Sequence, residues 1–188
     1  VAGNNASTDI QNILKENIME TNSYMSWACF YNVINRANTV LEFAPLVAEK
    51  DPNYRVSELY ANIAEAKAIR ALSYFYLIRA YKDVPYVTIP STDDTNEFVV
   101  PAEKFENILD SLIMDLEEVR TYAVNKYTNK KANTARFTRN GIDALLADLY
   151  LWDGDWDNSI AAVDRIVANR VEEYKKIFSE NAIKVYKL

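Results

Sequence analysis

Residues 64–87 read AEAKAIRALSYFYLIRAYKDVPYV, and this stretch decides the fold. Between residues 71 and 81 only Ser73 and Arg79 are clearly polar, whereas a helix at a protein surface carries a single apolar stripe. The pattern is typical of a helix that has other helices around it. Val84 stands before a proline, which disfavours the α conformation and ends the helix. We expect this helix at the centre of an all-helical bundle or solenoid.

Helical patterns continue on both sides of this central helix. Apolar residues recur at intervals of three and four, and polar or proline-containing segments separate the patterns. The expected helices cover residues 9–21, 24–48, 57–81, 102–122, 138–152, 157–169 and 171–179. Residues 82–101 and 123–137 are expected to be irregular connections, and the alternating residues 182–188 an extended end. The core of the central helix is expected to include Tyr74, Phe75 and Leu77.

Residues 141–167 have the residue spacing of a helical hairpin. A tetratricopeptide hairpin needs a small residue where its helices touch, aromatic residues around it, and a turn that contains glycine. Ala147, Tyr150 and Gly154 occupy these positions, although Ser159 stands where alanine is usual. We predict an all-α fold, namely a tetratricopeptide-like helical-hairpin solenoid (alpha-alpha superhelix) with degenerate repeats.

The composition of the 188 residues argues against several functions. The formal net charge is −6 and no basic stripe is present, which argues against a nucleic-acid partner. There is no histidine, the commonest general base and metal ligand. The acidic pairs Asp93–Asp94 and Glu117–Glu118 fall on a polar loop and a helix surface, where nothing would raise a carboxyl pKa. We expect no catalysis, and neither a metal nor an organic cofactor is implied.

Membrane and targeting signals are also missing from this sequence. No apolar run reaches the length of about 18 residues that a membrane-spanning helix needs. The first residues have neither the basic nor the apolar region of a signal peptide. The single cysteine, Cys29, lies in an apolar helical run, so we expect a small buried side chain rather than a reactive thiol.

Two polar residues lie within apolar helical patterns and must find partners. Arg70 and Asn38 are more typical of side chains that fix how helices pack than of ligand contacts, because buried polar groups are hydrogen-bonded. Glu65, or the end of a neighbouring helix, is the expected partner of Arg70.

Aromatic residues make up 12% of the chain and are the candidate ligand contacts. Trp152 and Trp156 flank Gly154, and packing between the two helices of the hairpin explains them. Tyr24 and Trp27 lie just after a break at residues 22–23, which makes them the candidate ligand-binding residues, with a place in the core as the alternative.

Four blocks of the sequence resemble the SusD/RagB family of nutrient-binding lipoproteins of bacterial outer membranes. In chain order the blocks are residues 27–38, 64–87, 112–118 and 135–156. The sequence departs from the family pattern at two positions, and both departures are mild. Ala135 replaces a usual glycine, and Leu109 stands where an aromatic residue is common. The resemblance implies that residues 1–188 are the N-terminal helical domain of a longer protein. The C-terminal half, which carries much of the ligand surface in this family, would be absent.

The resemblance also implies a function. Proteins of this kind are non-enzymatic; they capture oligosaccharides, or sometimes peptides, at the cell surface and pass them to a TonB-dependent (SusC-like) outer-membrane transporter. The lipid anchor would lie outside this chain. A cytoplasmic tetratricopeptide adaptor that binds peptides is the alternative, although such adaptors usually show regular repeats. A fragment of an α/α-barrel hydrolase is a third possibility, which would need carboxylates facing each other across a cleft.

Overall fold

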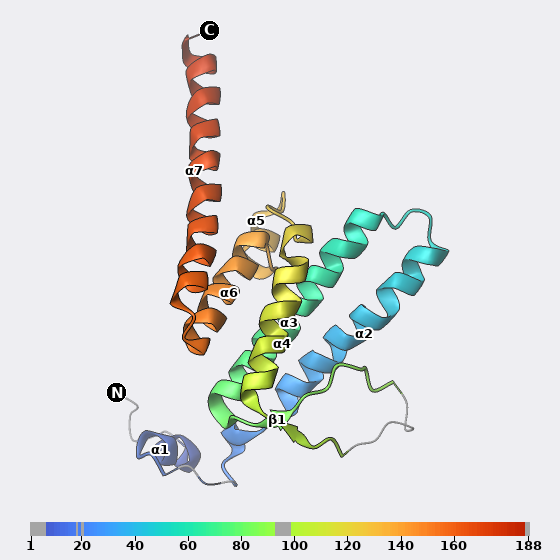
Figure 1. Cartoon of the computed structure of the whole chain (residues 1–188), viewed down its shortest axis with the longest axis vertical. Helices are drawn as coiled ribbons and strands as arrows, with labels where there is room; N and C mark the ends of the chain where they lie inside the picture. The colour runs from blue at the N-terminus through green and yellow to red at the C-terminus, as the bar shows by residue number, and fades with distance from the viewer. Residues whose placement is uncertain (1–6, 18, 20, 93–98, 187–188) are drawn as a thin grey trace.

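The computed structural model describes residues 7–17, 19, 21–92 and 99–186. The helices are α1 (Thr8–Leu14), α2 (Ala28–Lys50), α3 (Val56–Tyr81), α4 (Phe105–Val119), α5 (Lys130–Ala135), α6 (Arg139–Asp153) and α7 (Trp156–Tyr186). Two 3₁₀ turns, η1 (Ser23–Met25) and η2 (Arg120–Tyr122), and the antiparallel pair β1 (Val84–Pro85) and β2 (Ala102–Glu103) complete the described structure. Neighbouring helices pack in the order α2, α3, α4, α6 and α7, and α7 extends well past α6 (Figure 1). The fold is the predicted all-α solenoid.

Helix α3 is the centre of the core. It contacts α2, α4 and α6, so its side chains are covered on several sides. Tyr74 and Leu77 are 0% exposed and Phe75 is 2% exposed. These values confirm the three predicted core residues and explain why the sequence of α3 shows no single apolar stripe.

Arg70 ties α3 to both of its neighbours. Its guanidinium donates from Nη1 to Oδ1 of Asn38 on α2 at 2.9 Å, and from Nη2 to Oδ2 of Asp115 on α4 at 2.6 Å. The prediction that Arg70 and Asn38 act in helix packing is confirmed, but the expected partner was wrong. Glu65 is bound instead by Arg136, which lies 71 positions after it in the chain. Glu65 was expected because it is near Arg70 in the sequence, whereas the packing of α3 against α4 brings Asp115 to Arg70.

The segment after α3 crosses over α2 and is held there by side chains. The Tyr74 hydroxyl donates to the carbonyl of Val87 at 2.9 Å and accepts from its N–H at 2.7 Å. The amide of Asn38 donates to the same carbonyl at 3.0 Å. The sequence predicts helix from residue 102, but residues 102–103 pair with β1 and α4 begins at Phe105. The Phe105 N–H donates to the Asp83 carboxylate at 3.1 Å, which caps α4.

Helices α6 and α7 form the predicted hairpin. Gly154 ends α6 with φ of 84°, a left-handed conformation that favours glycine. The Ser159 hydroxyl donates to the carbonyl of Ala147 at 2.9 Å, so serine replaces the usual alanine at the helix contact by making a hydrogen bond across it. Asp143 is 0% exposed and accepts from Nε of both Arg120 and Arg165 at 2.8 Å. This ion cluster joins α6, η2 and α7.

Several predicted boundaries were wrong. The first helix ends at Leu14 rather than near residue 21, and Glu16 adopts a positive φ of 57° just beyond it. The connection at 123–137 contains the short helix α5. The region expected as two helices and an extended end is one helix that runs to Tyr186. No glycine or proline lies between residues 156 and 186, so nothing in the backbone stops α7.

Candidate ligand-binding surface

The turn before α2 is fixed by hydrogen bonds to α1. The side chain of Asn22 accepts from the Tyr24 N–H at 3.0 Å and donates to the carbonyl of Asp9 at 3.0 Å. The Asp9 carboxylate accepts from the N–H of Ser23 at 3.1 Å and from its hydroxyl. These hydrogen bonds lower the pKa of Asp9. The break that the sequence shows at residues 22–23 is therefore an ordered corner, which orients the residues after it.

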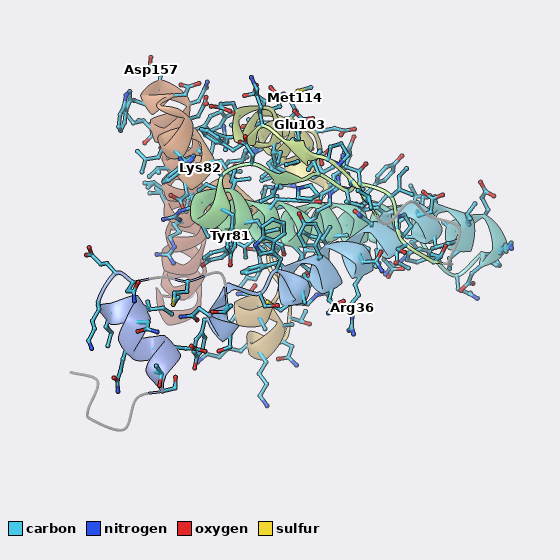
Figure 2. All side chains as sticks on the ribbon, turned by 90° about the horizontal axis from the view of Figure 1, so that it is seen from below. Arg36, Tyr81, Lys82, Glu103, Met114 and Asp157 are labelled. Carbon is cyan, nitrogen blue, oxygen red and sulfur yellow. The ribbon has the colours of Figure 1, made fainter. Side chains whose placement is uncertain are left out.

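Tyr24 and Trp27 both reach the surface at this corner, but in different ways. The Tyr24 side chain is 58% exposed, and in the described part of the chain it makes no ring contact. Trp27 is 36% exposed and packs against Tyr31 and Tyr81, with centroid separations of 6.2 and 5.3 Å. Figure 2 shows Tyr81 at the end of α3 that lies next to the start of α2. One ring is free in solvent, and the other is held in place with part of its surface uncovered.

The aromatic residues behind Trp27 give it a rigid support. The Tyr31 hydroxyl donates to the carbonyl of Pro85 at 2.7 Å, and burial raises the pKa of Tyr31 to about 12. The Tyr31 ring in turn meets the edge of Tyr74 at 6.3 Å. Burial also raises the pKa of Tyr74. Trp27 is thus attached to the buried core through a row of tyrosines. Cys29, near the start of the same helix α2, was expected to be buried, but it is exposed.

The two tryptophans of the hairpin lie at the surface rather than between the helices. Trp152 is 40% exposed; it meets Phe75 edge-on at 6.3 Å and has the Arg79 and Lys82 cations over its ring at 5.4 and 5.3 Å. Trp156 is 63% exposed, and the ring contacts of Trp152 are made with α3 and its C-terminal end, so the prediction that packing between the helices of the hairpin explains both residues was wrong. The same face of α7 exposes an apolar stripe of Trp156, Ile160, Val163, Val167 and Val171.

Each carboxylate of the acidic pair Glu117–Glu118 is bound by neighbouring side chains. Glu117 accepts from Nη2 of Arg165 at 3.1 Å and from the Tyr150 hydroxyl at 3.2 Å, and Glu118 pairs with Lys67 at 2.7 Å. Residues 93–94, the other acidic pair of interest, lie outside the described residues. Among the described residues no group of three or more His, Cys, Asp or Glu side chains is placed to hold a metal ion. The buried Asp143 was not foreseen, since nothing in the sequence separates it from surface acids.

The surface also has hollows that the sequence did not reveal. One, of about 480 Å³, lies beside α2 and α3 and is mainly apolar, with Val33, Val40 and Ile69 in its wall. Arg36 lies at its edge, and Figure 2 shows this side chain directed away from α2. A second hollow, of about 310 Å³, has lining residues from the start of α3, from the turn before it and from the connection between α4 and α6. Its residues are remote in sequence, so only folding brings them together.

The fold and this surface define a helical-hairpin scaffold that carries exposed aromatic residues. A family model of SusD-like proteins, described as "Starch-binding associating with outer membrane", matches residues 1–151. The chain belongs to the SusD-like family.

Relatives and solved structures agree with this assignment. SusD-like protein P38 of Formosa agariphila is 25% identical over 166 residues, which are 86% of this chain and 30% of the relative. A SusD-like protein of Bacteroides ovatus is 29% identical over 74% of this chain and 24% of its own length. The chain therefore spans less than a third of these curated relatives.

Among solved structures, a SusD superfamily protein from Bacteroides thetaiotaomicron superposes with a TM-score of 0.78 at 24% identity, over 89% of this chain and 40% of that structure. A laminarin-binding SusD-like protein superposes with a TM-score of 0.73 at 27% identity, over 84% of this chain and 33% of that structure. In the part of this chain that the structure describes, no helix is both long and apolar enough to cross a membrane.

Proposed function

We propose that this chain is the N-terminal helical domain of a cell-surface lipoprotein that captures oligosaccharides without transforming them. Membership of the SusD-like family supports glycan binding, because the description of the family refers to starch and one solved neighbour is a laminarin-binding protein. The observation that carries the proposal within this chain is the exposed aromatic corner at Tyr24 and Trp27. Aromatic rings on a rigid support suit the apolar faces of pyranose rings, because contact area is gained with little loss of conformational freedom.

The two residues would play different parts in binding. Trp27 is already fixed by Tyr31 and Tyr81, so its uncovered surface would provide a prepared platform. Tyr24, which makes no ring contact with the described residues, would close on the sugar from the side of η1. Two rings give a small contact surface, so we expect the isolated chain to bind glycans weakly.

Delivery is the second half of the proposal. Captured oligosaccharide would pass to a TonB-dependent (SusC-like) transporter in the outer membrane, and this helical domain would be the scaffold that docks on the extracellular loops of that transporter. The helices pack around one core, as a scaffold requires. A tagged chain should therefore co-purify a TonB-dependent transporter from detergent-solubilised outer membranes. Failure to recover one under conditions that preserve other membrane complexes would contradict the docking part alone.

Calorimetry of the purified chain tests the binding part. We expect maltoheptaose or laminarihexaose to bind weakly, and Trp27→Ala to remove the part of that binding that the aromatic corner provides. Trp156→Ala is the matched control, because it removes an exposed indole at another place on the surface. Equal loss in both variants, or binding untouched by Trp27→Ala, would exclude the aromatic corner. Tight binding abolished by Trp27→Ala would instead make this corner the primary site.

A further inference from the structure

The hollow of about 310 Å³ lies at the end of α3 that is remote from Trp27. Its lining residues are Tyr54, Glu58, Ala61, Asn62, Val124, Tyr127 and Arg136. The first turns of α3 form one side, and the connection that carries α5 forms the other, at the upper end of Figure 1. Asn62 and Tyr81, which touches Trp27, are about 28 Å apart along the helix at a rise of 1.5 Å per residue. The hollow is therefore separate from the aromatic corner.

Hydrogen bonds orient the polar groups on the α3 side of the hollow. The Asn62 side chain donates from Nδ2 to the Tyr54 hydroxyl at 2.7 Å. This bond leaves the carbonyl oxygen of the Asn62 amide as an acceptor and the hydrogen of the Tyr54 hydroxyl as a donor. Glu58 adds a carboxylate, which is held by the N–H of Arg55 at 3.2 Å and its guanidinium at 2.6 Å. Donors and acceptors thus alternate over one short stretch of surface.

The opposite side presents an oriented guanidinium on an aromatic ring. Arg136 donates from Nε to both oxygens of Glu65 at 3.0 and 3.1 Å and from Nη2 to the same carboxylate, which leaves Nη1 outside this ion pair. Its Cζ lies 4.6 Å from the centroid of Tyr127. Tyr127 is fixed at both ends, because its N–H donates to Asn133 at 3.1 Å and its hydroxyl to the carbonyl of Phe137 at 3.4 Å. Glu65 compensates the positive charge, so the site does not select for an anion.

This combination of groups matches the chemistry of a sugar. Each hydroxyl of a pyranose both donates and accepts, and planar amide, carboxylate and guanidinium groups bind adjacent hydroxyls in pairs. Tyrosine rings cover the apolar ring face. The volume falls at the lower end of the range for ligand pockets, roughly 300–1,000 Å³, and suits one sugar unit. The larger hollow beside α2 shares Tyr54 and Asn62 with this one, but its remaining wall is mainly apolar and does not include Tyr127 or Arg136.

We infer that the hollow between Tyr54, Asn62, Tyr127 and Arg136 is a second subsite, which binds a neutral hexopyranose unit of an oligosaccharide. The inference rests on the proposed glycan-binding function, but it concerns a different surface. The sequence could not indicate this subsite, because its residues come from two segments that are more than sixty positions apart.

Heteronuclear NMR of the isotope-labelled chain locates binding directly, with maltoheptaose and laminarihexaose as separate probes. We expect millimolar glucan to shift the side-chain amide of Asn62 and the ring signals of Tyr54 and Tyr127. Asn62→Ala removes one amide and should weaken this binding about fivefold, which corresponds to one hydrogen bond. Asn107→Ala is the matched control: it removes an exposed amide of α4 and should leave the affinity unchanged.

The location of the shifts separates this inference from the proposed function. Shifts confined to Tyr24 and Trp27 would overturn the second subsite and leave the aromatic corner in place. Shifts confined to the hollow would support the subsite and exclude the corner. Equal affinities of Asn62→Ala and wild-type chains, with the variant spectrum otherwise native, would overturn the assignment of Asn62. If neither glucan shifted signals at the aromatic corner or at the hollow, both proposals would be contradicted for these ligands.

Discussion

Helices α3 and α7 are the two longest helices of the molecule's described part, and they differ in how many neighbours they have. Helix α3 packs against α2, α4 and α6, and its sequence is apolar on nearly all sides. Helix α7 packs chiefly against α6, and it exposes Ile160 and Val167 on its outer face. In hairpin solenoids each repeat contacts its neighbours through such faces. The comparison teaches that the number of apolar residues does not decide whether a helix is central. The distribution of these residues around the helix decides it.

The largest effect should come from truncating the centre of α3. Phe75→Ala should lower the free energy of unfolding by about 3–5 kcal/mol, because contacts are lost and the surrounding helices cannot close the cavity. Urea denaturation measures this change. Tyr76→Ala, next in sequence but 53% exposed, is the control and should cost much less. A loss below about 1 kcal/mol for Phe75→Ala would place α3 at the surface and remove the basis of the comparison.

The inner attachment of α7 should be the next most sensitive. Asp143→Ala leaves the side chains of Arg120 and Arg165 without their buried partner, and these are 18% and 30% exposed. Since water can reach both cations, we expect a loss of about 2–3 kcal/mol, below the full cost of an isolated buried charge. Asp164→Ala, which changes an exposed acid of α7, is the control in the same denaturation experiment. Equal effects of the two variants would mean that the ion cluster does not fasten α7.

Ser159→Ala should have a smaller effect. The variant loses the hydrogen bond to the carbonyl of Ala147 but gains the residue that is usual at this helix contact. These changes oppose each other, so we expect a change in stability of less than about 1 kcal/mol, measured by thermal unfolding. A loss above twice that value would show that the hydroxyl, rather than close helix packing, holds the hairpin together.

The smallest effect is expected on the outer face of α7. The double variant Ile160→Lys/Val167→Glu changes side chains that are 61% and 53% exposed, so stability should stay within about 0.5 kcal/mol of wild type. Light scattering should show less association at high concentration, since two charges interrupt the apolar stripe. A marked loss of stability in urea would mean that this face is covered in the isolated chain, and α7 would then resemble α3.

Periodicity predicted the elements whose environment is decided locally. The central helix, its stop before Pro85 and the hairpin around Gly154 were all placed correctly, because they depend on neighbouring residues. The prediction failed where the surroundings of a residue come from segments that are distant in the sequence. Trp156 was expected to pack within the hairpin, and Cys29 was expected to be buried, but both are exposed. Neither position differs in local pattern from a buried one.

The candidate sites show the same division. The aromatic corner could be proposed from sequence, because the break at residues 22–23 marks the place where the chain turns and the rings reach the surface. The support of Trp27 by Tyr81 could not be foreseen, since the two residues lie on different helices. The hollow at Asn62 and Arg136 gave no signal in the sequence at all.

The sequence by itself determined the all-α class, the central place of α3 and the helical hairpin, because hydrophobic spacing and backbone-specific residues act over a few positions. Only the tertiary structure decided which charged groups pair, as with Arg70 and Asp115 or Glu65 and Arg136. It also decided which apolar faces stay exposed and which polar groups converge in a hollow. These features depend on the relative placement of helices, which is fixed by packing over the whole chain and leaves no local trace.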